Sequence, residues 1–193
     1  MTGAAVQRRL PRAEREQLIL DIAEREFGGH GFAGASMEQI ASGSGITKAL
    51  VYQYFGSKEA LYVACVERGR ARLFERLQQA AESVPPERML SAIVDVYFDG
   101  LDAARNDFYV LYGDAPARAV DEMRRRNATV IAELLRAGAR LPDEDVELVA
   151  QLIVGAGEQV GRWWLEHREV PAARVKAKFT AAVAGAISLL ERR

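Results

Sequence analysis

The sequence predicts an all-α fold of about nine helices, with a three-helix unit at the N-terminus and a larger helical bundle after it. Two observations predict this fold. Apolar residues recur every three or four positions along nearly the whole chain, which is the spacing of one helix face, and the alternation of a half-buried strand is almost absent. Glycine or proline also stands where these periodic segments are expected to begin or end, at 28–29, 43–45, 56, 85–86, 142 and 171.

The composition is that of an ordinary globular protein. The 193 residues are 49% hydrophobic and 27% charged, which suffices for a sizeable core under a charged surface. No apolar run reaches the roughly eighteen residues of a membrane span, and the first residues lack the apolar stretch of a signal peptide. We therefore expect a cytoplasmic protein with no membrane partner.

The sequence offers little chemistry for catalysis. It contains two histidines and one cysteine, and His167 has no second histidine or cysteine at ligand spacing. A nucleophile elbow, a phosphate-binding loop and a dinucleotide fingerprint are all missing. We expect no enzyme activity, no metal and no cofactor, and we expect Cys65 to be a small buried apolar side chain.

Four helices are expected in the N-terminal part, over 12–27, 37–42, 48–55 and 58–83. The first is expected to end at two glycines, with a loop at 30–34 after it. Ser36, Thr47 and Ser57 precede the other three helices, and each hydroxyl can accept a hydrogen bond from a free backbone amide of the first turn.

The two short helices have the spacing of a helix-turn-helix motif. Ala41 is small where the second helix packs on the first, Gly45 permits the turn, and Val51 anchors the second helix to the core. This packing leaves one side of the second helix free to enter the major groove of DNA with its N-terminal residues. The expected DNA-binding residues are Ser36, Thr47, Lys48, Ala49, Leu50, Tyr52, Gln53 and Lys58.

Each of these residue types suits a particular contact. Lys48 can donate to guanine or to a phosphate, and Gln53 can form paired bonds with adenine. Ala49 lets the helix approach closely, while Tyr52 and Lys58 suit phosphates that fix the register. Bulk charge gives no support, since residues 1–70 hold nine basic and eight acidic side chains. Whether the N-terminal arginines, Arg8, Arg9 and Arg12, form a minor-groove arm or a solvated tail stays open.

The C-terminal part is expected to hold five helices, over 87–101, 106–112, 115–139, 142–166 and 172–191. The last two are very apolar. The segment 155–161 is rich in glycine and alanine, which permits close approach of a neighbouring helix.

The stretch MEQIASGSGITKALVYQYFGSKEAL, from Met37 to Leu61, resembles the TetR family of bacterial repressors. The resemblance covers Glu16 to Cys65, and its most specific part begins at Gly45. It implies phosphate contacts for Tyr52 and Lys58, a small-molecule pocket in the C-terminal helices, and a homodimer whose last two helices form a four-helix bundle with those of the partner. The implied domains are 1–60 for DNA binding and 61–193 for ligand binding and dimerisation.

Aromatic side chains in the C-terminal part could line such a pocket, because ligand sites are mostly apolar with a few polar groups. The candidates are Tyr97, Phe98, Phe108, Tyr109, Tyr112, Trp163, Trp164 and His167. The alternative for each is that it fills the core or an interface.

The leading functional hypothesis is a DNA-binding transcriptional regulator. It would act as a dimeric repressor on a palindromic DNA operator and be released by a small apolar effector. The alternative is a helical small-molecule-binding or scaffold protein without sequence-specific DNA binding. An activator rather than a repressor is a further alternative, and the identity of the effector stays open.

Overall fold

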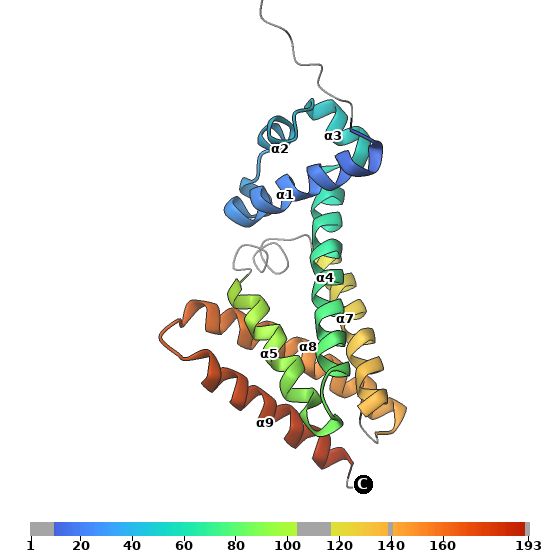
Figure 1. Cartoon of the computed structure of the whole chain (residues 1–193), viewed down its shortest axis with the longest axis vertical. Coiled ribbons are helices and arrows are strands. Elements are labelled where there is room, and N and C mark those ends of the chain that lie inside the picture. The colour runs from blue at the N-terminus through green and yellow to red at the C-terminus, as the bar shows by residue number, and fades with distance from the viewer. Residues whose placement is uncertain (1–9, 104–116, 139–140, 192–193) are drawn as a thin grey trace, which may run out of the picture.

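The computed structural model describes residues 10–103, 117–138 and 141–191, and every regular element in these residues is an α-helix (Figure 1). The helices are α1 (Arg12–Gly34), α2 (Met37–Gly43), α3 (Lys48–Phe55), α4 (Lys58–Glu82), α5 (Pro86–Ala103), α7 (Ala117–Gly138), α8 (Asp143–Glu166) and α9 (Ala172–Leu190). The all-α prediction is confirmed, and most expected bounds differ from the observed ones by one or two residues. The helix expected at 106–112 lies outside the described residues.

The end of α1 differs from the prediction. The helix continues through the two glycines at 28–29, and its backbone breaks only at Gly31, which has a φ of 69° and a ψ of 174°. Glycine inside a helix costs about 1 kcal/mol relative to alanine, and burial of Phe27 against Phe32 and Tyr62 offsets that cost. The kink therefore lies at Gly31, where the positive φ favours glycine, and the expected loop at 30–34 is largely helical.

The N-terminal unit consists of α1, α2, α3 and the first turns of α4, which gather at one end of the molecule (Figure 1). Its core is built from the inner faces of all four helices, including Ile19, Ile40, Val51 and Leu61, none of which is exposed to solvent. Cys65 is buried in this core, as expected from the sequence.

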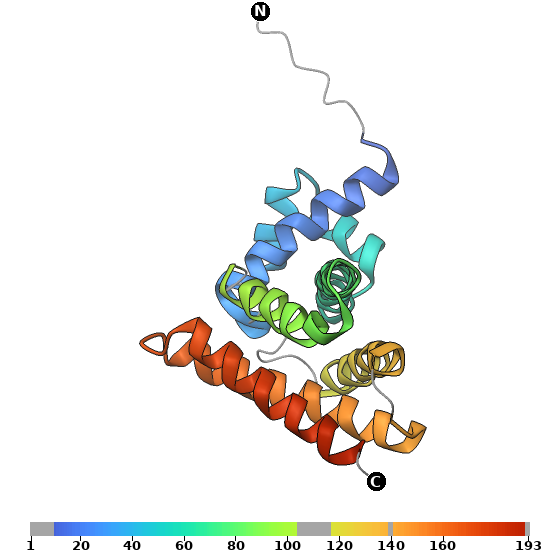
Figure 2. The ribbon, with the colours of Figure 1, turned by 60° about the horizontal axis from the view of Figure 1, so that its bottom comes forward.

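Helix α4 continues from the N-terminal unit along the C-terminal helices, where it packs against α5 and α7 (Figure 1). Helices α8 and α9 lie side by side on the far side of the C-terminal body, and a short turn at 167–171 connects them (Figures 1 and 2). Two apolar clusters hold this body together, one around Phe98, Trp164 and Phe179 and one around Leu135 and Val149. None of the described helices is apolar over enough length to cross a membrane.

Candidate DNA-binding surface and ligand cavity

The sequence folds α2 and α3 locally through their caps and the turn between them. The Ser36 hydroxyl accepts a hydrogen bond from the Gln39 amide at 3.3 Å, and the Thr47 hydroxyl accepts one from the Leu50 amide at 3.2 Å. Between the helices, Gly45 has a φ of 66°, a conformation that side chains disfavour. These contacts fix where α3 begins and which way it points.

Packing decides which side of α3 faces outward. Val51 is completely buried and anchors the helix to the N-terminal core. Four of the expected DNA-binding residues lie on the open side and are exposed, while Leu50 is half-buried; the exposed four are Lys48, Ala49, Tyr52 and Gln53. Thr47 is also exposed at the cap position. The structure thus brings the residues predicted on this helix onto one solvent-facing surface.

The first residue of α3 has a partner that the sequence reading missed. The Lys48 ammonium forms an ion pair with the carboxylate of Glu38 in α2. This hydrogen bond lowers the pKa of Glu38 and raises the pKa of Lys48. Glu38 lies ten residues before Lys48, and the contact between them depends on the angle of the turn that joins the two helices rather than on spacing within one helix.

Lys58 sits at the junction between the end of α1 and the start of α4. Its ammonium donates hydrogen bonds to the backbone oxygens of Ala33 at 3.2 Å and Ala35 at 2.6 Å, and it lies 5.2 Å from the centre of the Phe32 ring. Ser57 caps α4 by accepting from the Ala60 amide. Lys58 is therefore part of the contact between the two helices, beyond the phosphate role predicted for it.

The start of α1 bears on the proposed arginine arm. Arg8 and Arg9 lie outside the described residues. The Arg12 guanidinium is stacked over the Tyr54 ring, 5.1 Å from its centre, and therefore lies against α3.

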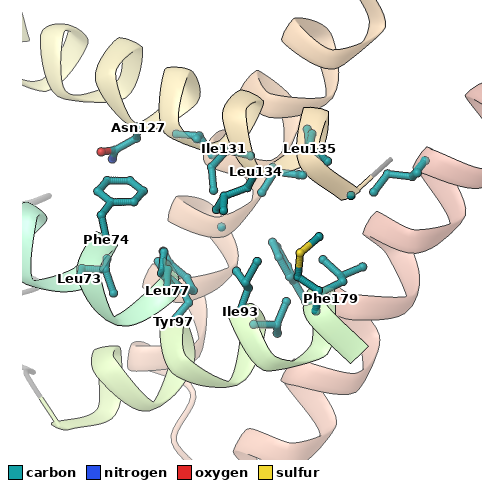
Figure 3. A pocket seen from close by; sticks show the side chains of 18 of the residues that line it. Leu73, Phe74, Leu77, Ile93, Tyr97, Asn127, Ile131, Leu134, Leu135 and Phe179 are labelled. Atoms are coloured by element: carbon teal, nitrogen blue, oxygen red, sulfur yellow. The ribbon is translucent and has the colours of Figure 1, made fainter. Parts of the chain in front are cut away.

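An apolar cavity of about 200 Å³ lies in the C-terminal body between α4, α5, α7, α8 and α9 (Figure 3). The described side chains that line it are nearly all aliphatic or aromatic. Among those labelled in Figure 3, Asn127 and Tyr97 carry polar groups. The labelled lining residues are Leu73, Phe74, Leu77, Ile93, Tyr97, Asn127, Ile131, Leu134, Leu135 and Phe179.

Five of the residues predicted for a pocket lie in the part of the chain that the structure describes, and Tyr97 is the one of these that lines the cavity. Tyr97 lines the cavity, whereas Phe98 and Trp164 fill the core with their rings in contact. Trp163 stacks on His167 and is 45% exposed, because consecutive residues of a helix point about 100° apart and only one tryptophan can face inward. The remaining predicted residues, Phe108, Tyr109 and Tyr112, lie outside the described residues.

Sequence reasoning missed Asn127, although a signal for it exists. It lies four residues after Met123 and four before Ile131, so the helical repeat places it on the same face as these two apolar residues. A polar residue on an apolar helix face indicates a place where a partner for it is needed, because burial of an amide without a partner is unfavourable.

Helix α7 connects the cavity to the N-terminal unit. Met123 is buried in the N-terminal core, and Asn127, one turn further along, lines the cavity. Between them, Arg126 forms an ion pair with Glu67 of α4 at 3.0 Å. A movement of α7 would therefore displace side chains both in the N-terminal core and in the wall of the cavity.

The outer faces of α8 and α9 carry large apolar side chains. Leu148 and Leu152 are 59% and 52% exposed, and Leu189 is 70% exposed. A Cβ added at Gly155 would meet no atom within 4 Å, so that part of α8 has an open face. Exposed apolar residues gathered on adjacent helices mark surfaces that bind other molecules.

The fold and the exposed, capped α3 define a helix-turn-helix protein with a second helical body. Two family models match the chain: bacterial regulatory proteins of the tetR family over residues 19–65, and a tetracyclin repressor-like C-terminal domain over residues 86–185. The second match covers more than half of the chain. The chain belongs to the TetR family of bacterial transcriptional regulators.

Individual relatives agree with this assignment. The transcriptional activator FasR of Mycolicibacterium smegmatis is 26% identical over 166 residues, which are 82% of this chain and 76% of FasR. A TetR-like regulator from Rhodococcus sp. RHA1 has a solved structure with a TM-score of 0.68 and 32% identity, covering 91% of this chain and 96% of that one. FadR of Bacillus subtilis, solved with stearoyl-CoA, has a TM-score of 0.71 at 17% identity over 89% of this chain and 97% of its own, which shows the fold alone.

Proposed function

We propose that this protein is a dimeric repressor that binds a two-fold symmetric operator and is released from it by a small apolar effector. The observation that carries the proposal is the exposed side of α3, where a capped and core-anchored helix presents Lys48, Ala49 and Gln53 to solvent. A recognition helix needs a fixed orientation and accessible N-terminal side chains, and Lys48 would leave its ion pair with Glu38 to contact DNA. Residues 1–60 would read DNA, and residues 61–193 would hold the effector and the dimer interface.

A dimer is proposed through α8 and α9. Reading two successive major grooves requires two copies of α3 related by a two-fold axis. The exposed leucines at 148, 152 and 189 supply apolar area for a four-helix bundle with the partner subunit.

Release is proposed to act through α7. Effector in the cavity would contact α7 near Asn127, and the same helix places Met123 in the N-terminal core and Arg126 on Glu67. A shift of α7 would change the separation of the two recognition helices. By linkage, the effector must bind the DNA-incompetent arrangement more tightly than the DNA-bound one.

The proposal is tested by fluorescence anisotropy with DNA fragments from around the gene for this chain. We expect one fragment to bind the wild-type protein specifically, with an affinity that falls steeply with salt. Tyr52→Phe should weaken binding to all fragments, because it removes a phosphate contact. Arg88→Ala, which removes a charge from exposed Arg88 of α5, is the matched control and should bind normally. Absence of any specific binding at low salt would favour the scaffold alternative.

The second candidate is an activator. The relative FasR is named an activator, so the family fold accommodates either sign of regulation. In vitro transcription from the bound promoter separates the two candidates: a repressor lowers the transcript, and an activator raises it.

A further inference from the structure

We infer that the effector of the C-terminal cavity is a compact, mainly apolar molecule that carries no anionic group and donates one hydrogen bond to Asn127. This inference rests on the proposed effector role of the cavity. Three properties of the cavity carry it: its size, the lack of a cation among its described lining residues, and one buried acceptor.

The size of the cavity limits the effector. An engineered protein cavity of about 150 Å³ lined by leucine, isoleucine and phenylalanine accepts benzene. The cavity here has a volume of about 200 Å³ and a similar lining. A ring with a short chain, of about ten non-hydrogen atoms, matches this volume.

The lining disfavours an anionic effector. Among the described residues that line the cavity, the acidic side chain is that of Glu191. No lysine or arginine of that set is available to pair with a carboxylate or phosphate. Burial of an unpaired anion is strongly unfavourable. An acyl-CoA would have to keep its phosphates outside the cavity.

Asn127 gives the site its polarity. The residue is 8% exposed and lines the cavity, and its side-chain oxygen is buried without a hydrogen-bond partner among the described residues. It lies at one end of the labelled lining, with Leu135 and Phe179 toward the other end (Figure 3). A buried acceptor without a partner favours a ligand that brings a donor, such as a hydroxyl or an N–H group.

Tyr97 limits the shape of the site on the opposite wall. Its ring lies against α8, where a Cβ added at Gly157 would be 3.6 Å from the Tyr97 hydroxyl oxygen. Asn127 belongs to α7, on the other side of the cavity from this contact (Figure 3). The apolar part of the effector would therefore run from Asn127 along Ile131 and Leu134 of α7.

The inference is tested by isothermal titration calorimetry on the full chain with matched probes. The probes are 4-propylphenol, propylbenzene, 4-propylbenzoate and stearoyl-CoA. Each is titrated into the wild-type protein and into Asn127→Leu, which keeps the volume and removes the acceptor. Thr129→Val is the control, because it removes a hydroxyl from the exposed side of the same helix.

We expect the ratio of 4-propylphenol affinity to propylbenzene affinity to be about tenfold higher in the wild-type protein than in Asn127→Leu. Thr129→Val should keep the wild-type ratio, and 4-propylbenzoate should bind at least tenfold more weakly than the phenol in all three proteins. An unchanged ratio in Asn127→Leu, tighter binding of stearoyl-CoA than of the phenol, or no binding of the phenol at millimolar concentration would overturn the inference.

The readout needs no DNA, so it separates this inference from the proposed function. Should 4-propylphenol bind as expected but leave the operator complex intact, the release mechanism fails and the ligand class stands. Should DNA binding and release be found with other molecules while the phenol does not bind, the ligand class fails and the repressor stands.

Discussion

Replacing Lys58 by methionine separates a structural role from a DNA-binding role. The ammonium of Lys58 donates to two backbone oxygens at the end of α1 and lies over the Phe32 ring. Methionine keeps most of the apolar stem and its packing but removes the charge and the donors. If Lys58 served only a phosphate, Lys58→Met would leave the free protein as stable as the wild type.

The contacts of Lys58 give the expected size of the loss in unfolding free energy. Hydrogen bonds that involve a charged group contribute about 1.5–3 kcal/mol when shielded from water. Lys58 is only half-buried, and solvent screening reduces that contribution. With a further contribution of about 0.5 kcal/mol from the ring contact, we expect Lys58→Met to lower the free energy of unfolding by about 2 kcal/mol.

The assay is urea unfolding of the free protein followed by circular dichroism, without DNA. For a chain of this size, about 2 kcal/mol corresponds to a fall in Tm of about 4–8 °C. Lys178→Met, at an exposed lysine of α9, is the matched control and should change stability by less than about 0.5 kcal/mol. Equal stability of Lys58→Met and the wild type would refute the junction role assigned to Lys58.

Three further predictions concern the Lys48–Glu38 ion pair, the burial of Met123 and the exposed leucines of α8. Lys48→Met should raise the pKa of Glu38 in an NMR titration, because the hydrogen bond from Lys48 lowers that pKa in the wild-type protein. The Lys48–Glu38 ion pair is intact at neutral pH and is lost as the pH falls through the lowered pKa of Glu38. Met123→Ala should lower the free energy of unfolding by about 2–5 kcal/mol in urea, because the side chain is 2% exposed in the N-terminal core; a loss below 1 kcal/mol would contradict that packing. Leu148→Glu with Leu152→Glu should convert the protein to monomers in sedimentation velocity, and an unchanged dimer would place the interface elsewhere.

Most of the fold could be predicted because its signals are local. Ser36, Thr47 and Ser57 each cap the helix that the sequence assigned to it, since capping depends on residues only three positions apart. The end of α1 could not be predicted, because it depends on the packing of Phe27 against Tyr62 of α4 and against Phe32, which follows the kink at Gly31. Tertiary packing overrode a local stop signal there.

The candidate site likewise has features that local sequence predicts and features that depend on how the helices pack. The outward side of α3 follows from the periodicity that buries Val51, so its exposed residues could be named in advance. The Lys48–Glu38 pair and the double contact of Lys58 depend on angles between helices, which no spacing rule supplies. The cavity depends on five helices at once. The sequence predicted aromatic residues there, and Tyr97 does line the cavity, but aliphatic side chains such as Leu77 and Ile131 form most of the described lining.

The role of α3 is tested most directly by selection of preferred sequences from randomised double-stranded DNA. The wild-type protein should select a two-fold symmetric site whose halves are spaced by whole turns of the duplex. Lys48→Ala and Gln53→Ala should each change the preferred base at the same position in both halves, while Arg88→Ala should leave the site unchanged. Identical preferences in the wild type and both α3 variants would show that this helix does not read DNA.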